Sequence, residues 1–139
     1  MHRIFKYDQS WSIALYMLVI LFGIAAILNM AHLHVLFLTT HAADLSGPAM
    51  LYIQFRKSWQ QGNRKILTTL FGCSPEITAS VFFFGSTATE IIQKYYPHGI
   101  FPGRFDPWDI VSYAVGVGIC YGLEKAKIGM VESETVSYG

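Results

Sequence analysis

Long apolar segments alternate with short polar ones along this chain, and the apolar segments have the length of membrane spans. Residues 11–28 carry no charge, and residues 77–89 and 110–123 are uncharged as well. A helix needs about 20 predominantly apolar residues to cross a hydrocarbon core of about 30 Å. The pattern therefore predicts membrane-spanning helices at these three places.

Two of these segments carry a recognisable helix start. Ser74-Pro75-Glu76 combines an N-cap serine, a proline at the first helical position and an acid in the first turn. Asp106-Pro107-Trp108-Asp109 repeats the same arrangement. These starts extend the predicted helices to residues 75–96 and 107–125, which is enough for a full span in each case.

A further apolar segment, residues 39–55, carries His41, Asp44 and Pro48, and we expect Pro48 to kink it. We interpret it as another span, and residues 64–71 as a short helix on the inner membrane surface. The sequence thus predicts one all-α domain, residues 1–139, an integral membrane bundle of four transmembrane helices. The helices fall at about 10–30, 39–56, 75–96 and 107–125, followed by a tail at 126–139.

Composition agrees with a membrane protein. Hydrophobic residues make up 53% of the chain, charged residues 14%, and the mean hydropathy is +0.37. This is too apolar for an ordinary small soluble domain. The first apolar segment exceeds the length of a signal-peptide core, so we expect a retained helix. A formal net charge of +1 gives no reason to expect nucleic acid as a partner, and we expect the lipid bilayer instead.

The distribution of basic residues predicts the orientation. With four spans, every lysine and arginine except Lys94 and Arg104 lies on the side of the two termini. Segments rich in these residues stay in the cytoplasm. Both termini are therefore expected in the cytoplasm, with the chain a multi-pass membrane protein.

This orientation gathers polar residues from distant parts of the chain on the outer face. We expect a ligand-binding or structural cluster formed by His41, Asp44, Glu90, Gln93, Arg104, Asp106 and Asp109. Glu90 should face the bundle and have a partner, because ionisable groups are unfavourable in lipid. Arg104 is the expected partner, since its guanidinium can engage a carboxylate with two hydrogen bonds. Asp109 could share it.

Simpler interpretations exist for each acid. Asp106 could be an N-cap alone, and Asp109 could only favour the helix dipole. Glu90 could pair with Lys94, one turn further along the helix.

Histidines add a weaker possibility. His41 and Asp44, three residues apart, could bind a metal or join the outer cluster. Their spacing supplies few preorganised ligands, so we predict no metal and no cofactor. His32 and His34 are expected to have no special role.

Small residues recur every four positions in the last helix, at Ala114, Gly118 and Gly122. Such faces let helices approach closely in lipid. Gly116 widens that face, and Gly85, Ser86 and Ala88 give the preceding helix a matching patch. We expect these two faces to pack together and to hold Glu90 near Asp109.

The polar motif resembles one known family. The resemblance is to VanZ-like membrane proteins. It is carried by Glu90-Ile91-Ile92-Gln93, Pro97, the run from Arg104 to Asp109, and Tyr113-Ala114-Val115-Gly116. The segment from His41 to Pro48 is similar, more loosely, to the polar opening of that family's second helix. This chain has Ser112-Tyr113 where the family usually has an asparagine, and it carries an insertion before Arg104.

The resemblance implies a multi-pass protein of the cell envelope, in the bacterial cytoplasmic membrane, connected with antibiotic resistance, whose biochemical reaction is undefined. Three functions stay open. The outer cluster could bind a glycopeptide or a lipid-linked envelope ligand. The chain could instead be a small accessory or structural subunit of a larger membrane complex. In the third reading it is a hydrolase or transferase acting on a lipid, with Glu90 as general base.

Overall fold

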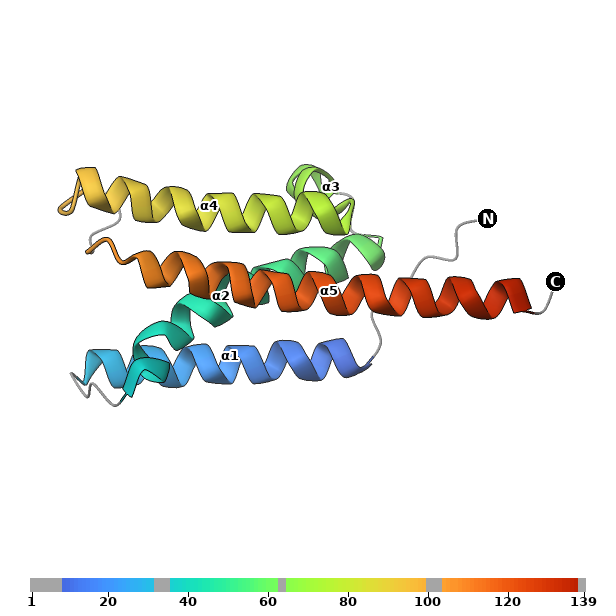
Figure 1. Ribbon diagram of the computed structural model, residues 1–139, viewed down its shortest axis with the longest axis horizontal. Coiled ribbons are helices and arrows are strands. Elements are labelled where there is room, and N and C mark those ends of the chain that lie inside the picture. Colours follow the sequence, from blue (N-terminus) through green and yellow to red (C-terminus); the bar gives the residue numbers. More distant parts are fainter. Residues whose placement is uncertain (1–8, 32–35, 63–64, 100–103, 138–139) are drawn as a thin grey trace.

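The computed structural model shows an all-α protein, as the sequence predicts, and describes residues 9–31, 36–62, 65–99 and 104–137 (Figure 1). No strand occurs within these ranges. The described residues form the helices α1 (Gln9–Met30), α2 (Leu36–Gln60), α3 (Ile66–Gly72), α4 (Pro75–Tyr95) and α5 (Pro107–Ser137). Four of them correspond to the predicted long helices, and α3 corresponds to the predicted short one. Residues 126–137, expected to form a tail, continue α5 instead.

Helix α2 is the centre of the bundle. It contacts α1, α3, α4 and α5, and α4 also packs against α5 (Figure 1). The short α3 lies at the end of the bundle where α4 begins, at an angle of 98° to α4. The apolar core lies between α1, α2 and α5 and is built around Trp11, Ala49, Tyr52, Ile53, Val117 and Cys120.

Both predicted helix starts are confirmed by their hydrogen bonds. The Ser74 hydroxyl accepts a hydrogen bond from the Ile77 N–H at 3.1 Å. The Asp106 carboxylate accepts one from the Trp108 N–H at 2.9 Å. Each bond satisfies an N–H that the first turn of a helix would leave without a partner. Asp106 is therefore the N-cap of α5, in agreement with the simpler interpretation of this residue.

The closest approach between helices occurs where α5 crosses α2 at Gly116. A Cβ atom on Gly116 would lie 2.1 Å from the carbonyl oxygen of Leu45, so only glycine fits there. In the same stretch of α2, the Ser46 hydroxyl donates to the carbonyl of Ala42 at 2.6 Å. Pro48 lies inside α2 and has no N–H, so the helical hydrogen bond to the carbonyl of Asp44, four residues earlier, is missing. The polar stretch of α2 thus lies directly against the backbone of α5.

The prediction that the small residues of α5 pack against α4 is wrong. Ala114, Gly118 and Gly122 are exposed, and a Cβ atom on either glycine would meet nothing within 4 Å. Gly85 and Ala88 of α4 are exposed as well. Helix α5 instead turns Tyr113, Gly116, Val117, Cys120 and Glu124 inward. This face is favoured because α2 offers its side chains hydrogen-bond partners and a close backbone contact, which the exposed face lacks.

The surface of the described bundle is apolar and its interior holds charges. Met30, Ile27, Tyr16 and Phe84 are among the large hydrophobic side chains that are more than half exposed, whereas Arg56, Glu90 and Glu124 are buried. Among the helices that the structure describes, α1 alone is long and apolar enough to cross a membrane, and 11% of its apolar stretch is buried. Helices α3 and α4 meet the same criterion only as a bent pair.

Candidate functional site

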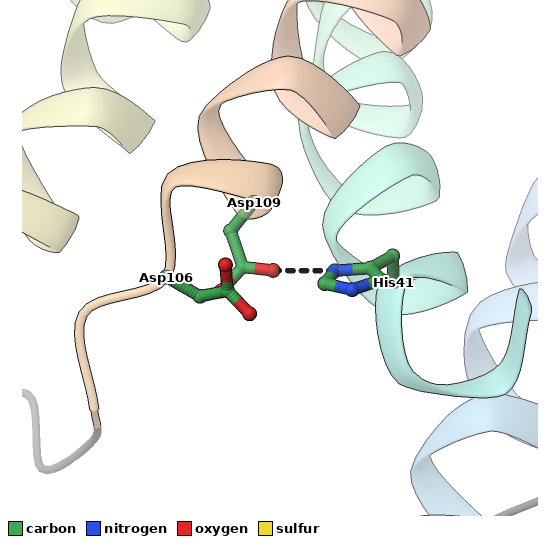
Figure 2. Close-up of side chains that lie close together, drawn as sticks. All are labelled: His41, Asp106 and Asp109. Atoms are coloured by element: carbon green, nitrogen blue, oxygen red, sulfur yellow. Dashed lines mark hydrogen bonds and ion pairs between the residues drawn. The ribbon is translucent and has the colours of Figure 1, made fainter. Parts of the chain in front are cut away.

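One end of the bundle collects polar side chains from three helices. His41 and Asp44 lie in the first turns of α2, Glu90 lies near the end of α4, and Asp106 and Asp109 lie at the start of α5. Figure 2 shows how His41 on α2 points toward the two aspartates of α5. The predicted meeting of these distant segments is therefore present in the structure.

Glu90 fixes the start of α5 against α4. Its side chain is buried, with 3% of the residue exposed. One carboxylate oxygen accepts a hydrogen bond from the Tyr113 hydroxyl at 2.8 Å, and the other lies 3.4 Å from the backbone N–H of Asp106. Both oxygens are thus used within the protein, which gives Glu90 a positioning role.

The prediction that a cation pairs with Glu90 is wrong. Within the described part of the chain, neither Arg104 nor Lys94 has a carboxylate oxygen within 4.0 Å. The Lys94 ammonium lies over the ring of Phe105 instead, 5.2 Å from its centroid. The Tyr113 hydroxyl replaces the expected cation, because a neutral donor can satisfy a buried carboxylate without bringing a second charge out of water.

Arg104 faces an open hollow at this end of the bundle. The hollow has a volume of about 450 Å³ and is lined by Asp44, Arg104, Phe105, Asp106 and Asp109. The Arg104 side chain is exposed. Its guanidinium is therefore available to an anionic group that enters the hollow beside three aspartates.

His41 forms a short polar contact with Asp109. Its Nδ1 atom lies 2.6 Å from a carboxylate oxygen of Asp109, and the two side chains are 10% and 16% exposed (Figure 2). Asp44 lies beside this pair, within 3.4 Å of the Tyr113 hydroxyl. His41 and Asp44 thus belong to the polar cluster at this end of the bundle, which is one of the two roles considered for them in the sequence.

The side chains of His41, Asp106 and Asp109 could together hold a metal ion. Each offers one ligand atom, and these atoms all lie within 4.8 Å of one another. They comprise one imidazole nitrogen and two carboxylate oxygens, a ligand set common for first-row transition metals.

Other predicted residues lie further from this arrangement. Gln93 is partly exposed, one turn beyond Glu90, and has no hydrogen-bond partner among the residues the structure describes. His32 and His34 lie outside the described residues.

A second polar network, at the opposite end of the bundle, was not predicted. Glu124 is completely buried and receives hydrogen bonds from Arg56 and from the Tyr52 hydroxyl. Arg56 also donates to the carbonyl of Gly72 at 2.6 Å. The sequence held one signal, a glutamate that immediately precedes Lys125 at the end of an apolar helix, but Arg56, at the predicted end of the second helix, was counted only as a cytoplasmic positive charge.

Fold and site define a small helical bundle with a carboxylate-rich polar end and a buried ion pair at the other end. Comparisons of the chain with protein-family models, with curated proteins and with solved structures find no match. The resemblance to VanZ-like proteins therefore stays a prediction from the residues that carry it.

Proposed function

We propose that the chain is an integral membrane protein whose four long helices span the bilayer. The apolar exterior and charged interior support this proposal, because ionisable residues within membrane helices face the bundle and pair there. Helices α2, α4 and α5 are less hydropathic than α1 partly because they carry ionisable residues. Among these are Arg56, Glu90 and Glu124, and all three are buried in the bundle rather than turned to the surface.

In this arrangement the carboxylate-rich end faces outward. Lys57, Lys65, Lys125 and Lys127 belong to the opposite end, where α2 stops, α3 begins and α5 leaves the bundle (Figure 1). Lysines of short loops remain on the cytoplasmic side. The hollow then opens toward the cell exterior.

The function supported best is the binding of an envelope ligand in this hollow. The observation that carries it is the exposed guanidinium of Arg104, which lines the hollow together with Asp44, Asp106 and Asp109. Such a lining suits a ligand that presents an anionic group to the arginine and hydroxyl or amino groups to the carboxylates. Lipid-linked cell-wall precursors and glycopeptides both have this chemistry, in agreement with the VanZ-like resemblance.

Replacing Arg104 by alanine is expected to weaken ligand binding at least tenfold, because a charge-assisted hydrogen bond to an anion is lost. Binding is measured with purified full-length protein in lipid nanodiscs, using a fluorescent polyprenyl-diphosphate sugar and, separately, a glycopeptide. Lys65→Ala is the matched control, since it removes the same charge from the other end and should bind normally. Equal binding by wild type and Arg104→Ala would refute the proposed site.

A role as accessory subunit is the second candidate, and the exposed face of α5 favours it. Gly118 and Gly122 leave open space beside the helix, where a partner helix could approach closely in lipid. Gentle purification from the source membrane followed by mass spectrometry separates the two functions. A stoichiometric protein partner supports the subunit, whereas a lone chain carrying lipid or glycan supports ligand binding.

The enzymatic alternative has less support from the geometry. A general base must reach the proton that it removes from the substrate. Glu90 uses both oxygens within the protein and is not among the residues that line the hollow. Its contacts favour a positioning role over proton transfer.

A further inference from the structure

We propose that His41, Asp106 and Asp109 form a binding site for a divalent transition-metal ion, of the type of Zn²⁺ or Mn²⁺, at the edge of the hollow. The inference deepens the proposed function and rests on it for the ligand that the ion would meet. Binding of the ion itself is a separate property and is tested with the metal alone.

The three side chains come from α2 and from the start of α5, and these two helices pack against each other. His41 is fixed in the first turns of α2, and the two aspartates occupy the N-cap and the third helical position of α5. Close packing at Gly116, two turns along α5, sets the distance between the helices. The ligand atoms are thereby brought within 4.8 Å of one another by the fold rather than by a flexible loop.

The His41–Asp109 pair requires only a small adjustment to accept an ion, and the Asp106 ligand atom lies within 4.8 Å of both. Two ligand atoms that each lie about 2.1 Å from a tetrahedral ion are about 3.4 Å apart. His41 Nδ1 and the Asp109 oxygen are 2.6 Å apart, closer than this, because a proton lies between them. Binding replaces that proton by the ion, and the proton leaves to solvent. The two atoms then need to separate by less than about 1 Å.

The surrounding charges favour a cation. Asp44 lies next to Asp109, and Glu90 shares the Tyr113 hydroxyl with Asp44, so two further carboxylates face this region. Arg104 is the positive side chain of the hollow lining. A divalent ion would balance the carboxylates and leave Arg104 free for an anionic ligand, which could also contact the ion.

The identity of the ion follows from the ligand types. An imidazole nitrogen beside carboxylate oxygens suits Zn²⁺, Mn²⁺ and Fe²⁺, whereas Mg²⁺ and Ca²⁺ prefer oxygen ligands throughout. Excess Mg²⁺ or Ca²⁺ is therefore expected not to displace Zn²⁺ from this site.

The test uses full-length protein with a tag free of histidine, purified in detergent, treated with a chelator and titrated with ZnCl₂ or MnCl₂ by isothermal calorimetry. We expect one ion per chain in wild type and at least tenfold weaker binding in His41→Ala and Asp106→Asn. Asparagine is as good an N-cap as aspartate, so Asp106→Asn keeps the start of α5 while it weakens a metal ligand. His98→Ala, which changes an exposed histidine outside the site, should bind as wild type does.

Two results would overturn the proposal. One is the absence of stoichiometric binding by folded wild-type protein, and the other is equal affinity in wild type, His41→Ala and Asp106→Asn. Either result leaves the Arg104 experiment intact. Conversely, metal binding that depends on His41 while Arg104→Ala leaves ligand binding unchanged would support the ion and refute the proposed ligand site.

Discussion

The Arg56→Met variant is expected to lose about 3–5 kcal/mol of folding stability, because the substitution leaves a buried carboxylate without its cation. Arg56 donates through Nε and Nη2 to Glu124, with a shortest distance of 2.6 Å, and through Nη1 to the carbonyl of Gly72. The two ionic side chains are 6% and 0% exposed. A single arginine thus connects the end of α2 with α5 and with the last residue of α3.

The effect is measured as the loss of helical circular dichroism or of monodisperse protein on heating in mild detergent. The matched control is Lys125→Ala, which breaks the exposed ion pair with Glu76 at 3.0 Å. Exposed pairs contribute about 0–1 kcal/mol, so this control should melt close to wild type. Adding Glu124→Leu to Arg56→Met should restore part of the loss, since the unpaired charge is removed. An Arg56→Met protein as stable as the Lys125→Ala control would contradict the role of the network.

The Gly116→Ala variant is expected to be destabilised by about 1–3 kcal/mol, the range typical of overpacking. The added methyl group would meet the Leu45 carbonyl oxygen at 2.1 Å and its carbon at 3.1 Å. These are backbone atoms of α2, which cannot rotate away as a side chain would. Helices α2 and α5 must therefore separate, and the loss exceeds what alanine gains in helix propensity.

Two other glycines of the same helix provide the control. Gly118→Ala and Gly122→Ala place a methyl group where nothing lies within 4 Å. Because alanine favours the helix by up to about 1 kcal/mol over glycine, these variants should be as stable as wild type or more so. Thermal melts of the three variants in one detergent decide the matter. Equal stability of all three would show that α5 does not approach α2 at Gly116.

Helix positions were accessible from the sequence because they depend on local signals. The serine and aspartate caps at Ser74 and Asp106 mark where α4 and α5 begin, and both bonds are present. The gathering of His41, Asp44, Glu90 and Asp109 at one end followed from counting spans. Neither inference needs the details of side-chain packing.

Pairings between side chains were less accessible. The arginine nearest in sequence to the acids, Arg104, was expected to neutralise Glu90, but the carboxylate takes the hydroxyl of Tyr113. Which face of α5 turns inward depends on the shape of α2, whose Leu45 backbone fits against Gly116. A repeat of small residues indicates where another helix can approach closely. At Gly118 and Gly122, however, no other described helix of this chain packs against that surface.

In the proposed arrangement the carboxylate-rich end belongs to a membrane bundle and faces outward. This arrangement is tested most directly by single cysteines at two exposed turns, introduced as His98→Cys beside the site and Gln61→Cys at the opposite end. Both are placed in a Cys73→Ser, Cys120→Ala background that removes the two free thiols. Labelling uses a membrane-impermeant maleimide on spheroplasts. We expect the cysteine at position 98 to react in intact spheroplasts and the cysteine at position 61 to react only after lysis. Equal reaction at both positions before lysis, or the reverse pattern, would contradict the account.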